Sequence, residues 1–275
     1  MDSPEAEEEV PYAIHDRGYK DLLSFWKIFR QLMTGYVGEE WVNRLDYEKG
    51  RRIEKSFILP GYRERESDIL YRVPLLEDPR KEVYLYVLIE HQSSVDYTMS
   101  FRVLVYLVNL WVDIFRNTDE NLRRRKNFRL PPVFAVVLYN GAPGWTAPLT
   151  VRELVEKSEL FGDFIPNVEY HLVDIQRQDK EKLKRLQNCL AGVLLLKRDV
   201  ERDRFRDELR EALDLIFREG DNELWKGVIQ WVLMRLKRDY PEKASEFLED
   251  IDFAKRTREE VRTMLETMPT KLIAY

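Results

Sequence analysis

Apolar residues recur at two different spacings along the 275-residue chain, and the spacing changes as the chain proceeds. Over residues 15–32 they recur every third or fourth position, which predicts an amphipathic helix, and residues 39–46 carry a second, shorter helical pattern. Short apolar and aromatic runs bounded by Pro, Gly and clustered charges follow, and such runs favour strands. They cover residues 56–59, 68–73 and 83–89.

The next part of the chain combines a long helical pattern with further strand signals. Residues 98–115 predict a long helix, for which Asp96 is a candidate N-cap. Arg123, Arg124, Arg125 and Lys126 are interpreted as a solvated connector. Residues 133–139 are almost continuously apolar, as expected of a strand buried on both faces, and residues 171–175 predict a last strand.

The remainder of the chain is predicted to be helical. Apolar residues line one face of 205–217 and another of 224–236, and Thr257 with Glu260 forms a capping-box pattern for a last helix. The order of helix, three strands, helix and strand therefore predicts an α/β core followed by a helical appendage.

The charge distribution limits the kind of nucleic-acid binding that the chain can support. The formal net charge is −5, but residues 1–9 hold five acids and no base, so the rest has 45 basic and 45 acidic residues. Residues 1–12 are predicted to be a disordered acidic tail. A neutral body excludes a histone-like binder, yet it can carry the local basic groove that a DNA enzyme needs.

Three features predict a soluble, cytoplasmic protein with no membrane partner. The first residues are acidic where a signal peptide is basic and then apolar, and the apolar run over 104–115 is interrupted by Asn109 and Asp113. That run is shorter than the roughly 20 residues of a membrane span. The lone cysteine, Cys189, lies in an apolar helical pattern and is interpreted as a buried thiol in a reducing compartment.

The second and third predicted strands bring two carboxylates into possible register. If they pair symmetrically about Pro79, residues whose numbers sum to 158 face each other, and Asp68 then stands opposite Glu90. Their Cβ atoms would lie roughly 5 Å apart. Two such carboxylates repel each other unless a cation separates them, and oxygen ligands favour Mg²⁺. Period-two alternation places Gln92 on the side of Glu90 and His91 on the other side.

The residues alone leave a simpler alternative open, in which Asp68 and Glu90 are exposed strand-end side chains. Against it, Glu90 ends the apolar run over 84–89, where a charge is costly without a partner. That partner could equally be an arginine, either Arg72 or Arg102.

At these residues the chain resembles the Rpn recombination-promoting nucleases, also called YhgA-like proteins. The resemblance runs in order over about residues 13–176, and several motifs in register make it specific. The matching pieces are Arg65-Glu66-Ser67-Asp68-Ile69-Leu70-Tyr71, Leu88-Ile89-Glu90-His91-Gln92-Ser93-Ser94, His15-Asp16 with Lys20, Met99-Ser100-Phe101-Arg102, Leu130-Pro131-Pro132-Val133 and Val137-Leu138-Tyr139-Asn140-Gly141.

The family is similar to PD-(D/E)XK nucleases, and this resemblance implies both a fold and a chemistry. It implies an α/β nuclease domain over 13–176, a helical C-terminal region over 177–275, and cleavage of DNA with Mg²⁺ or another divalent cation such as Mn²⁺ or Ca²⁺. Asp68 stands at the first acidic position. Glu90, His91 and Gln92 stand at the E-x-K position, with glutamine in place of lysine and the His91 backbone carbonyl as a further ligand.

Other residues of the predicted site have roles that the sequence leaves open. Asn140 stands where the family often has histidine. Asp16, or Glu54 in its place, is a candidate third acid, and helix capping is an equal alternative for Asp16. A DNA groove is predicted along a set of basic residues, each of which taken singly is more often a plain surface residue: Lys20, Arg51, Arg52, Lys55, Arg63 and Arg65.

The sequence therefore predicts a Mg²⁺-dependent DNA endonuclease with a role in recombination or mobile-element activity. One alternative keeps the fold as an inactive DNA-binding or protein-interaction module. Another is strand transfer by three carboxylates, as in enzymes of the ribonuclease H type. That chemistry needs an acid on a helix late in the chain, and the sequence offers no convincing one in an apolar setting. Homodimerisation and DNA clamping both stay open for the helical C-terminal region.

Overall fold

The structure is a computed structural model that describes residues 21–53, 69–90, 95–141, 143–197, 205–218, 224–230 and 259–263. The chain divides into two compact units. Unit 1 holds residues 1–20 and 44–172, and unit 2 holds residues 21–43 and 173–275. The domain limits 13–176 and 177–275 stay predictions.

A mixed sheet organises the first unit. Its strands are β1 (Arg51–Ile53), β2 (Ile69–Pro74), β3 (Glu82–Glu90), β4 (Val133–Tyr139) and β5 (His171–Asp174), in the order β1-β2-β3-β4-β5. β1, β2 and β3 pair antiparallel, whereas β3 and β4 are parallel. Apolar and aromatic runs form β2, β3 and β4, as predicted, whereas β1 has two arginines in three residues. The predicted strand over 56–59 lies outside the described residues.

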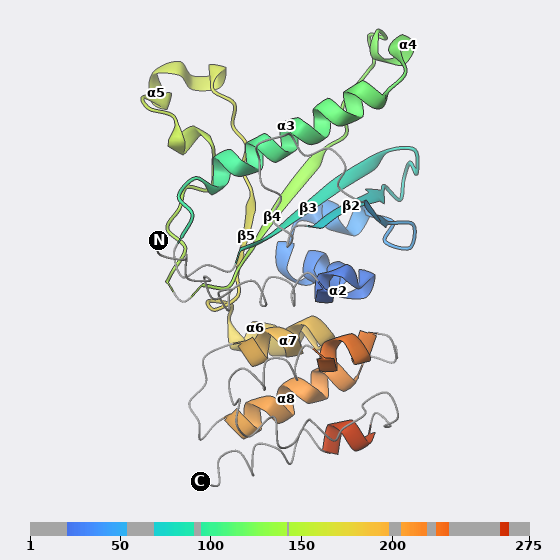
Figure 1. Cartoon of the computed structure of the whole chain (residues 1–275), viewed down its shortest axis with the longest axis vertical. Coiled ribbons are helices and arrows are strands. Elements are labelled where there is room, and N and C mark those ends of the chain that lie inside the picture. Colours follow the sequence, from blue (N-terminus) through green and yellow to red (C-terminus); the bar gives the residue numbers. More distant parts are fainter. Residues whose placement is uncertain are drawn as a thin grey trace, which may run out of the picture. The chain divides into compact units, whose positions relative to one another are not determined.

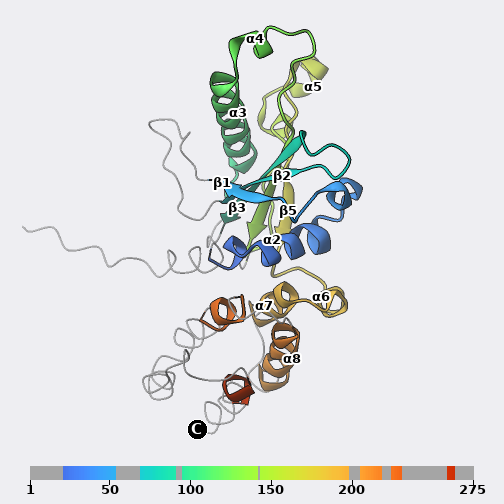
Figure 2. The same cartoon turned by 90° about the vertical axis from the view of Figure 1, so that its right-hand side faces the viewer.

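Helix α3 (Met99–Asn117) connects the parallel strands β3 and β4 and covers one face of the sheet (Figures 1 and 2). Its buried stripe includes Met99, Val103 and Tyr106, which belong to one apolar cluster with side chains of β2, β3 and β4. The cluster includes Leu70, Tyr84, Tyr86, Ala135 and Val137. The predicted α/β class is therefore correct, and the arrangement is consistent with a PD-(D/E)XK-like core.

The predicted hairpin register is wrong by two residues. Ile69 pairs with Val87 and Pro74 with Glu82, so paired residue numbers sum to 156 and not to 158. The connection is not symmetric about Pro79, because Leu75 donates its backbone N–H to the Lys81 carbonyl at 2.9 Å while Lys81 donates to the Asp78 carbonyl at 2.9 Å, which puts a tight turn over 78–81 on the C-terminal side of the connection. The pairing of β2 with β3 is therefore centred on Asp78 and not on Pro79, and the Asp78 side chain accepts a hydrogen bond from the Arg80 backbone N–H within the turn.

The N-cap of α3 lies two residues beyond the predicted one, and the helix begins at Met99, one residue later than predicted. The N-cap is Thr98, and the Asp96 carboxylate accepts hydrogen bonds from the Thr98 backbone N–H at 2.9 Å and from its hydroxyl at 2.7 Å. Asp96 therefore supports the first turn through Thr98 and does not occupy the N-cap itself.

Short helices interrupt the long connections of unit 1. Asp119 caps α4 (Glu120–Arg123) by accepting from the backbone of Asn121 and Leu122, so Arg123 ends a helix and is not part of a connector as predicted. Between β4 and β5 lie the 3-10 helix η3 (Arg152–Leu154), α5 (Ser158–Phe161) and the 3-10 helix η4 (Gly162–Phe164).

Apart from the last two residues of β5, the regular elements described in unit 2 are helices. They are the helical turn over 21–24, α2 (Trp26–Leu32), the π-helix η1 (Met33–Val37), α6 (Lys180–Leu186), α7 (Cys189–Lys197), α8 (Phe205–Phe217) and the helical stretches over 224–230 and 259–263. The 3-10 helix η2 (Glu40–Arg44) runs from unit 2 to the first residue of the 44–172 segment.

Packing between α7 and α8 requires a small residue. A Cβ on Gly192 would lie 2.6 Å from the Ala212 carbonyl oxygen, which is closer than any side chain tolerates. Cys189 of the same helix is buried, as predicted. In the described part of the chain, every helix falls short of the length or apolarity needed to cross a bilayer.

Candidate active site

The carboxyl ends of β3 and β4 meet at one edge of the sheet. Glu90, the last residue of β3, is the register partner of Tyr139, the last residue of β4. Asn140 follows at once and is only 4% exposed. Parallel strands thus bring position 90, a predicted metal ligand, to the same edge of the sheet as position 140, whose role the sequence leaves open. α/β proteins place their ligands at such an edge.

Most residues of the predicted site lie outside the described part of the chain. These are Asp16, Lys20, Glu54, Lys55, Arg63, Arg65, Asp68, His91 and Gln92. For Glu90 the structure gives the place in β3, and for Arg51 and Arg52 it gives the place in β1. The convergence of Asp68 and Glu90 on one cation therefore stays a prediction.

The structure shows the acidic neighbours of Arg72 and Arg102, the two arginines that the sequence suggested as partners of Glu90. Arg72 pairs in register with Tyr84, and its Nε lies 3.3 Å from a Glu82 carboxylate oxygen. Six residues of extended β3 separate Tyr84 from Glu90, which is roughly 20 Å. Arg72 is therefore not the partner of Glu90.

Arg102 forms an ion pair with Asp96, 2.6 Å long, in which both side chains are largely buried. Burial by itself would raise the pKa of Asp96, but hydrogen bonds from Thr98 and Arg102 prevail and hold that pKa below its ordinary value. The pair fixes the start of α3 just after the chain leaves β3.

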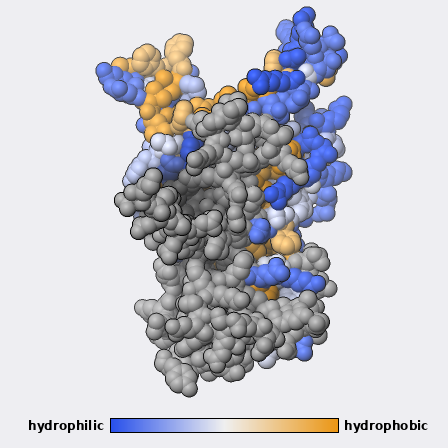
Figure 3. Space-filling model, in the orientation of Figure 1, coloured by the Kyte–Doolittle hydropathy of each residue, from blue (hydrophilic) through white to orange (hydrophobic). Residues whose placement is uncertain are grey.

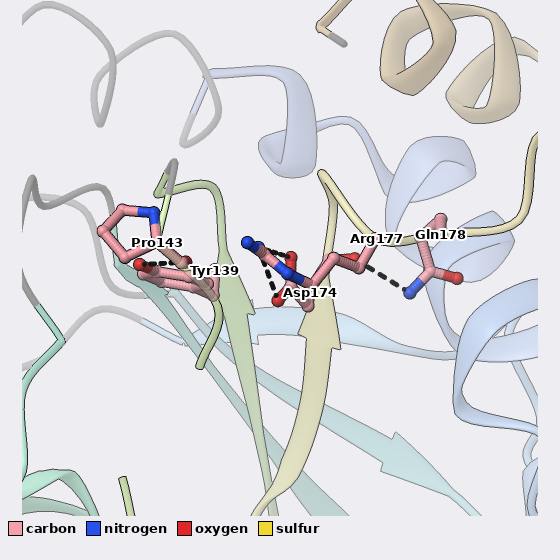
Figure 4. A network of polar contacts seen from close by, with 5 residues as sticks. All are labelled: Tyr139, Pro143, Asp174, Arg177 and Gln178. Carbon is pink, nitrogen blue, oxygen red and sulfur yellow. Dashed lines mark hydrogen bonds and ion pairs between the residues drawn. The ribbon is translucent and has the colours of Figure 1, made fainter. Parts of the chain in front are cut away.

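A tyrosine organises the loop that follows β4. The Tyr139 hydroxyl donates to the Pro143 carbonyl at 2.9 Å, as Figure 4 shows. The Tyr139 ring also contacts Trp145 edge-on, with 4.7 Å between ring centroids. The loop therefore turns back over the last residue of β4.

A second tyrosine holds the far side of the same loop. Trp145 Nε1 donates to the Tyr170 hydroxyl at 2.9 Å, and that hydroxyl donates to the Pro148 carbonyl at 3.0 Å. Burial raises the pKa of Tyr170 far above its ordinary value, so the hydroxyl stays protonated and keeps its donor. Tyr139, Trp145 and Tyr170 form a connected aromatic network that the sequence interpretation missed. Its signal was aromatic residues flanking a Pro- and Gly-rich loop.

The carboxyl end of β5 carries its own set of polar contacts (Figure 4). Arg177 Nη1 lies 3.2 Å from an Asp174 carboxylate oxygen, and Gln178 Nε2 donates to the Asp174 backbone carbonyl at 3.1 Å. These contacts fix the chain as it leaves the last strand.

The two predicted DNA-binding residues of β1 differ in their surroundings. Arg51 is the register partner of Arg72, and both lie near one acid, with Arg51 Nη2 3.8 Å from the Glu82 carboxylate. Arg52 is exposed and is the register partner of Tyr71. Arg51 therefore has an acidic neighbour that lowers the local positive charge.

Among the described residues, no group of three or more His, Cys, Asp or Glu side chains is placed to hold a metal ion. The predicted ligands Asp68 and His91 lie outside that set, so this finding does not bear on them.

The strand order and the helix that covers the sheet define an α/β protein with a mixed five-stranded sheet, consistent with a PD-(D/E)XK-like core. A family model described as "Putative transposase, YhgA-like" matches residues 13–224. The chain therefore belongs to the YhgA-like family, and the resemblance seen in its sequence is confirmed.

Curated relatives carry nuclease names. The chain is 29% identical over 128 residues to the recombination-promoting nuclease RpnD of Escherichia coli O157:H7, which is 46% of this chain and 45% of the relative. It is 30% identical over 132 residues to RpnC of Escherichia coli K12, covering 46% of this chain and 39% of the relative. The chain thus matches less than half the length of either nuclease.

A third relative is named differently. Over 92 residues, 34% of this chain and 86% of the relative, the chain is 32% identical to YjiP of Escherichia coli K12. That protein is named a "Putative inactive recombination-promoting nuclease-like protein". No solved structure matches the chain. The relatives support a nuclease or recombination-related function in general terms.

Proposed function

We propose that this protein is a Mg²⁺-dependent DNA endonuclease whose metal ligands are Asp68 and Glu90. The observation that carries the proposal is the place of Glu90, which ends β3 beside Tyr139 at the shared edge of two parallel strands. The nuclease names of relatives from the same family support it.

The observed register is compatible with a shared site for the two acids. Shifting a hairpin by two residues preserves the alternation of faces, since side chains repeat with period two. If the alternation of side chains in β2 extends to the residue before Ile69, position 68 faces position 88. Positions 68 and 90 are then diagonal neighbours on the same face of the sheet. Diagonal neighbours in a sheet lie about 7–8 Å apart, a span that one cation between two carboxylates can bridge.

The donor types of the proposed ligands fit Mg²⁺. Two carboxylates and the His91 backbone carbonyl are hard oxygen donors of the kind that Mg²⁺ prefers, while Mn²⁺ and Ca²⁺ take the same donors. When bound, the cation polarises the scissile phosphate and lowers the pKa of a water molecule.

The other residues of the proposed site would position the reactants. Gln92 would orient the attacking water or donate to a phosphate oxygen, because an amide does not accept a proton near neutral pH. Because Gln92 cannot accept the proton of the water, that proton would pass to bulk solvent. Asp16 is proposed as a third acid, and Lys20, Arg52 and their basic neighbours in sequence as contacts to DNA phosphates.

A plasmid assay tests this proposal. Purified protein with supercoiled DNA is expected to produce nicked or linear DNA with Mg²⁺ and none when the cation is chelated. The alternative function, an inactive binding module, is favoured by one specific observation, the name of the relative YjiP. That alternative predicts DNA or protein binding without cleavage under either condition. Joined products in place of cut ones would instead indicate strand transfer.

A further inference from the structure

Unit 1 exposes an apolar surface along α3 and over the segment that carries α5, and a monomer leaves this surface in water. Figure 1 shows α4 beyond one end of α3 and α5 near the other end. Define the α5 lobe as residues 152–164 and the α4 tip as residues 119–130. Figure 3 shows apolar residues over the lobe and along α3, and hydrophilic residues over α4.

The α5 lobe is a folded projection with outward aromatic side chains. Arg152 Nη2 donates to the Gly162 carbonyl at 2.8 Å and lies 3.6 Å from the Asp163 carboxylate, which closes the lobe on itself. Yet Phe164 is 93% exposed, Leu160 is 72% exposed, and Phe161 is also exposed. Clustered apolar exposure of this kind marks an interaction surface.

The outer side of α3 continues this apolar surface. Phe101, Val108, Val112 and Phe115 are all exposed, although they belong to a helix whose opposite side packs on the sheet. A helix that is apolar on both sides is expected to be buried on both sides. The stripe is also symmetric in sequence about Val108, since Phe101 lies seven residues before it and Phe115 seven residues after it.

The two ends of the surface carry opposite charge. The α5 lobe has four acids and two bases, whereas the α4 tip has five bases and two acids. The tip is folded too, because Phe115 contacts Phe128 edge-on and Arg123 stacks on the Phe115 ring at 4.7 Å. Leu122 and Leu130 add exposed apolar area to the tip.

We infer that this surface binds a second copy of the chain, with the two α3 helices antiparallel about a two-fold axis near Val108. This arrangement brings the acidic α5 lobe of each copy against the basic α4 tip of the other and buries the apolar stripe of both. An isologous interface requires such self-complementarity, because each surface element meets its counterpart twice. The inference does not depend on the proposed nuclease activity.

Charge reversal provides a test specific to this pairing. The variant Glu156→Lys/Glu159→Lys makes the lobe basic like the tip, and Arg125→Glu/Lys126→Glu makes the tip acidic like the lobe. All four side chains are exposed. Sedimentation velocity on the full-length chain is expected to show a dimeric parent, each variant alone shifted to monomer, and a heterodimer when the two variants are mixed. If a membrane or a nucleic acid covered this surface instead, mixing the two variants would not produce a dimer.

A substitution within the stripe gives an independent readout. Val108→Arg is expected to weaken self-association by at least about tenfold. The matched control Leu76→Arg alters a 57% exposed leucine in the β2–β3 connection and is expected to leave it unchanged. Circular dichroism verifies that each variant is folded. A monomeric parent, failure of the mixed variants to pair, or equal effects at positions 108 and 76 would overturn the inference.

Discussion

Glu90 and Tyr139 end neighbouring parallel strands as direct register partners, so the last residue of β3 and the last residue of β4 share one edge of the sheet. The buried Tyr139 also ties down the following loop through its hydroxyl. The candidate site is thus adjacent to a loop that is fixed by side chains of unit 1.

Removing the Tyr139 hydroxyl tests the importance of that loop. Tyr139→Phe leaves the Pro143 carbonyl without this donor, and we expect the free energy of unfolding to fall by about 1–2 kcal/mol. Urea denaturation measures the change. Tyr97→Phe is the matched control, because the Tyr97 hydroxyl contacts Thr146 at the surface, and its effect is expected to stay within about 0.5 kcal/mol. An equal fall in the free energy of unfolding for the two variants would show that the Tyr139 hydrogen bond to the loop contributes no more than a surface contact.

The Asp96–Arg102 pair predicts a dependence of stability on acid pH. Since the folded protein holds the pKa of Asp96 below its ordinary value of 3.8, the carboxylate stabilises the fold above that value. This contribution is lost as the pH falls through the lowered pKa. We expect Asp96→Asn to cost about 1–3 kcal/mol at neutral pH.

Unfolding curves recorded at several pH values check this sign. The stability difference between parent and Asp96→Asn should shrink as the pH is lowered below 4, because both then carry an uncharged side chain at this position. A difference that is constant with pH would mean that the Asp96 charge contributes nothing.

Arg52 is expected to contact a DNA phosphate. Arg52→Ala should weaken DNA binding and reduce the slope of log K against log salt by about 0.9, the value for one lost phosphate contact. Lys49→Ala is the control, since Lys49 is a nearby exposed base whose Nζ lies 2.8 Å from the Asp46 carboxylate. Fluorescence anisotropy at several salt concentrations measures both slopes. The same slope for Arg52→Ala and the parent would show that Arg52 does not contact a DNA phosphate.

The sequence predicted the elements whose pattern is strong. β4 was predicted with the observed limits, and α3 differs by only one or two residues at each end, because long apolar runs and helical periodicity determine such elements. The site edge followed from the same patterns, since Glu90 ends an apolar run and the observed β3 ends there too.

Features determined by tertiary contacts could not be predicted in this way. β1 is short and begins with two arginines, so it has no strand pattern and depends on pairing with β2. The hairpin register depended on an asymmetric connection between β2 and β3, which symmetry about a proline does not capture. The hydrogen bonds linking Trp145, Tyr170 and Pro148 join residues distant in sequence, and no local signal specifies them.

The most direct test of the central claim compares plasmid nicking by isosteric variants of the two proposed ligands. Asp68→Asn and Glu90→Gln are each expected to reduce Mg²⁺-dependent nicking by at least about 100-fold, because an amide is a poor substitute for a carboxylate ligand. Glu77→Gln changes an exposed acid in the connection between β2 and β3; this control should cut like the parent, with folding verified by urea denaturation. Folded variants of Asp68 and Glu90 that nick plasmid as fast as the parent would contradict the account.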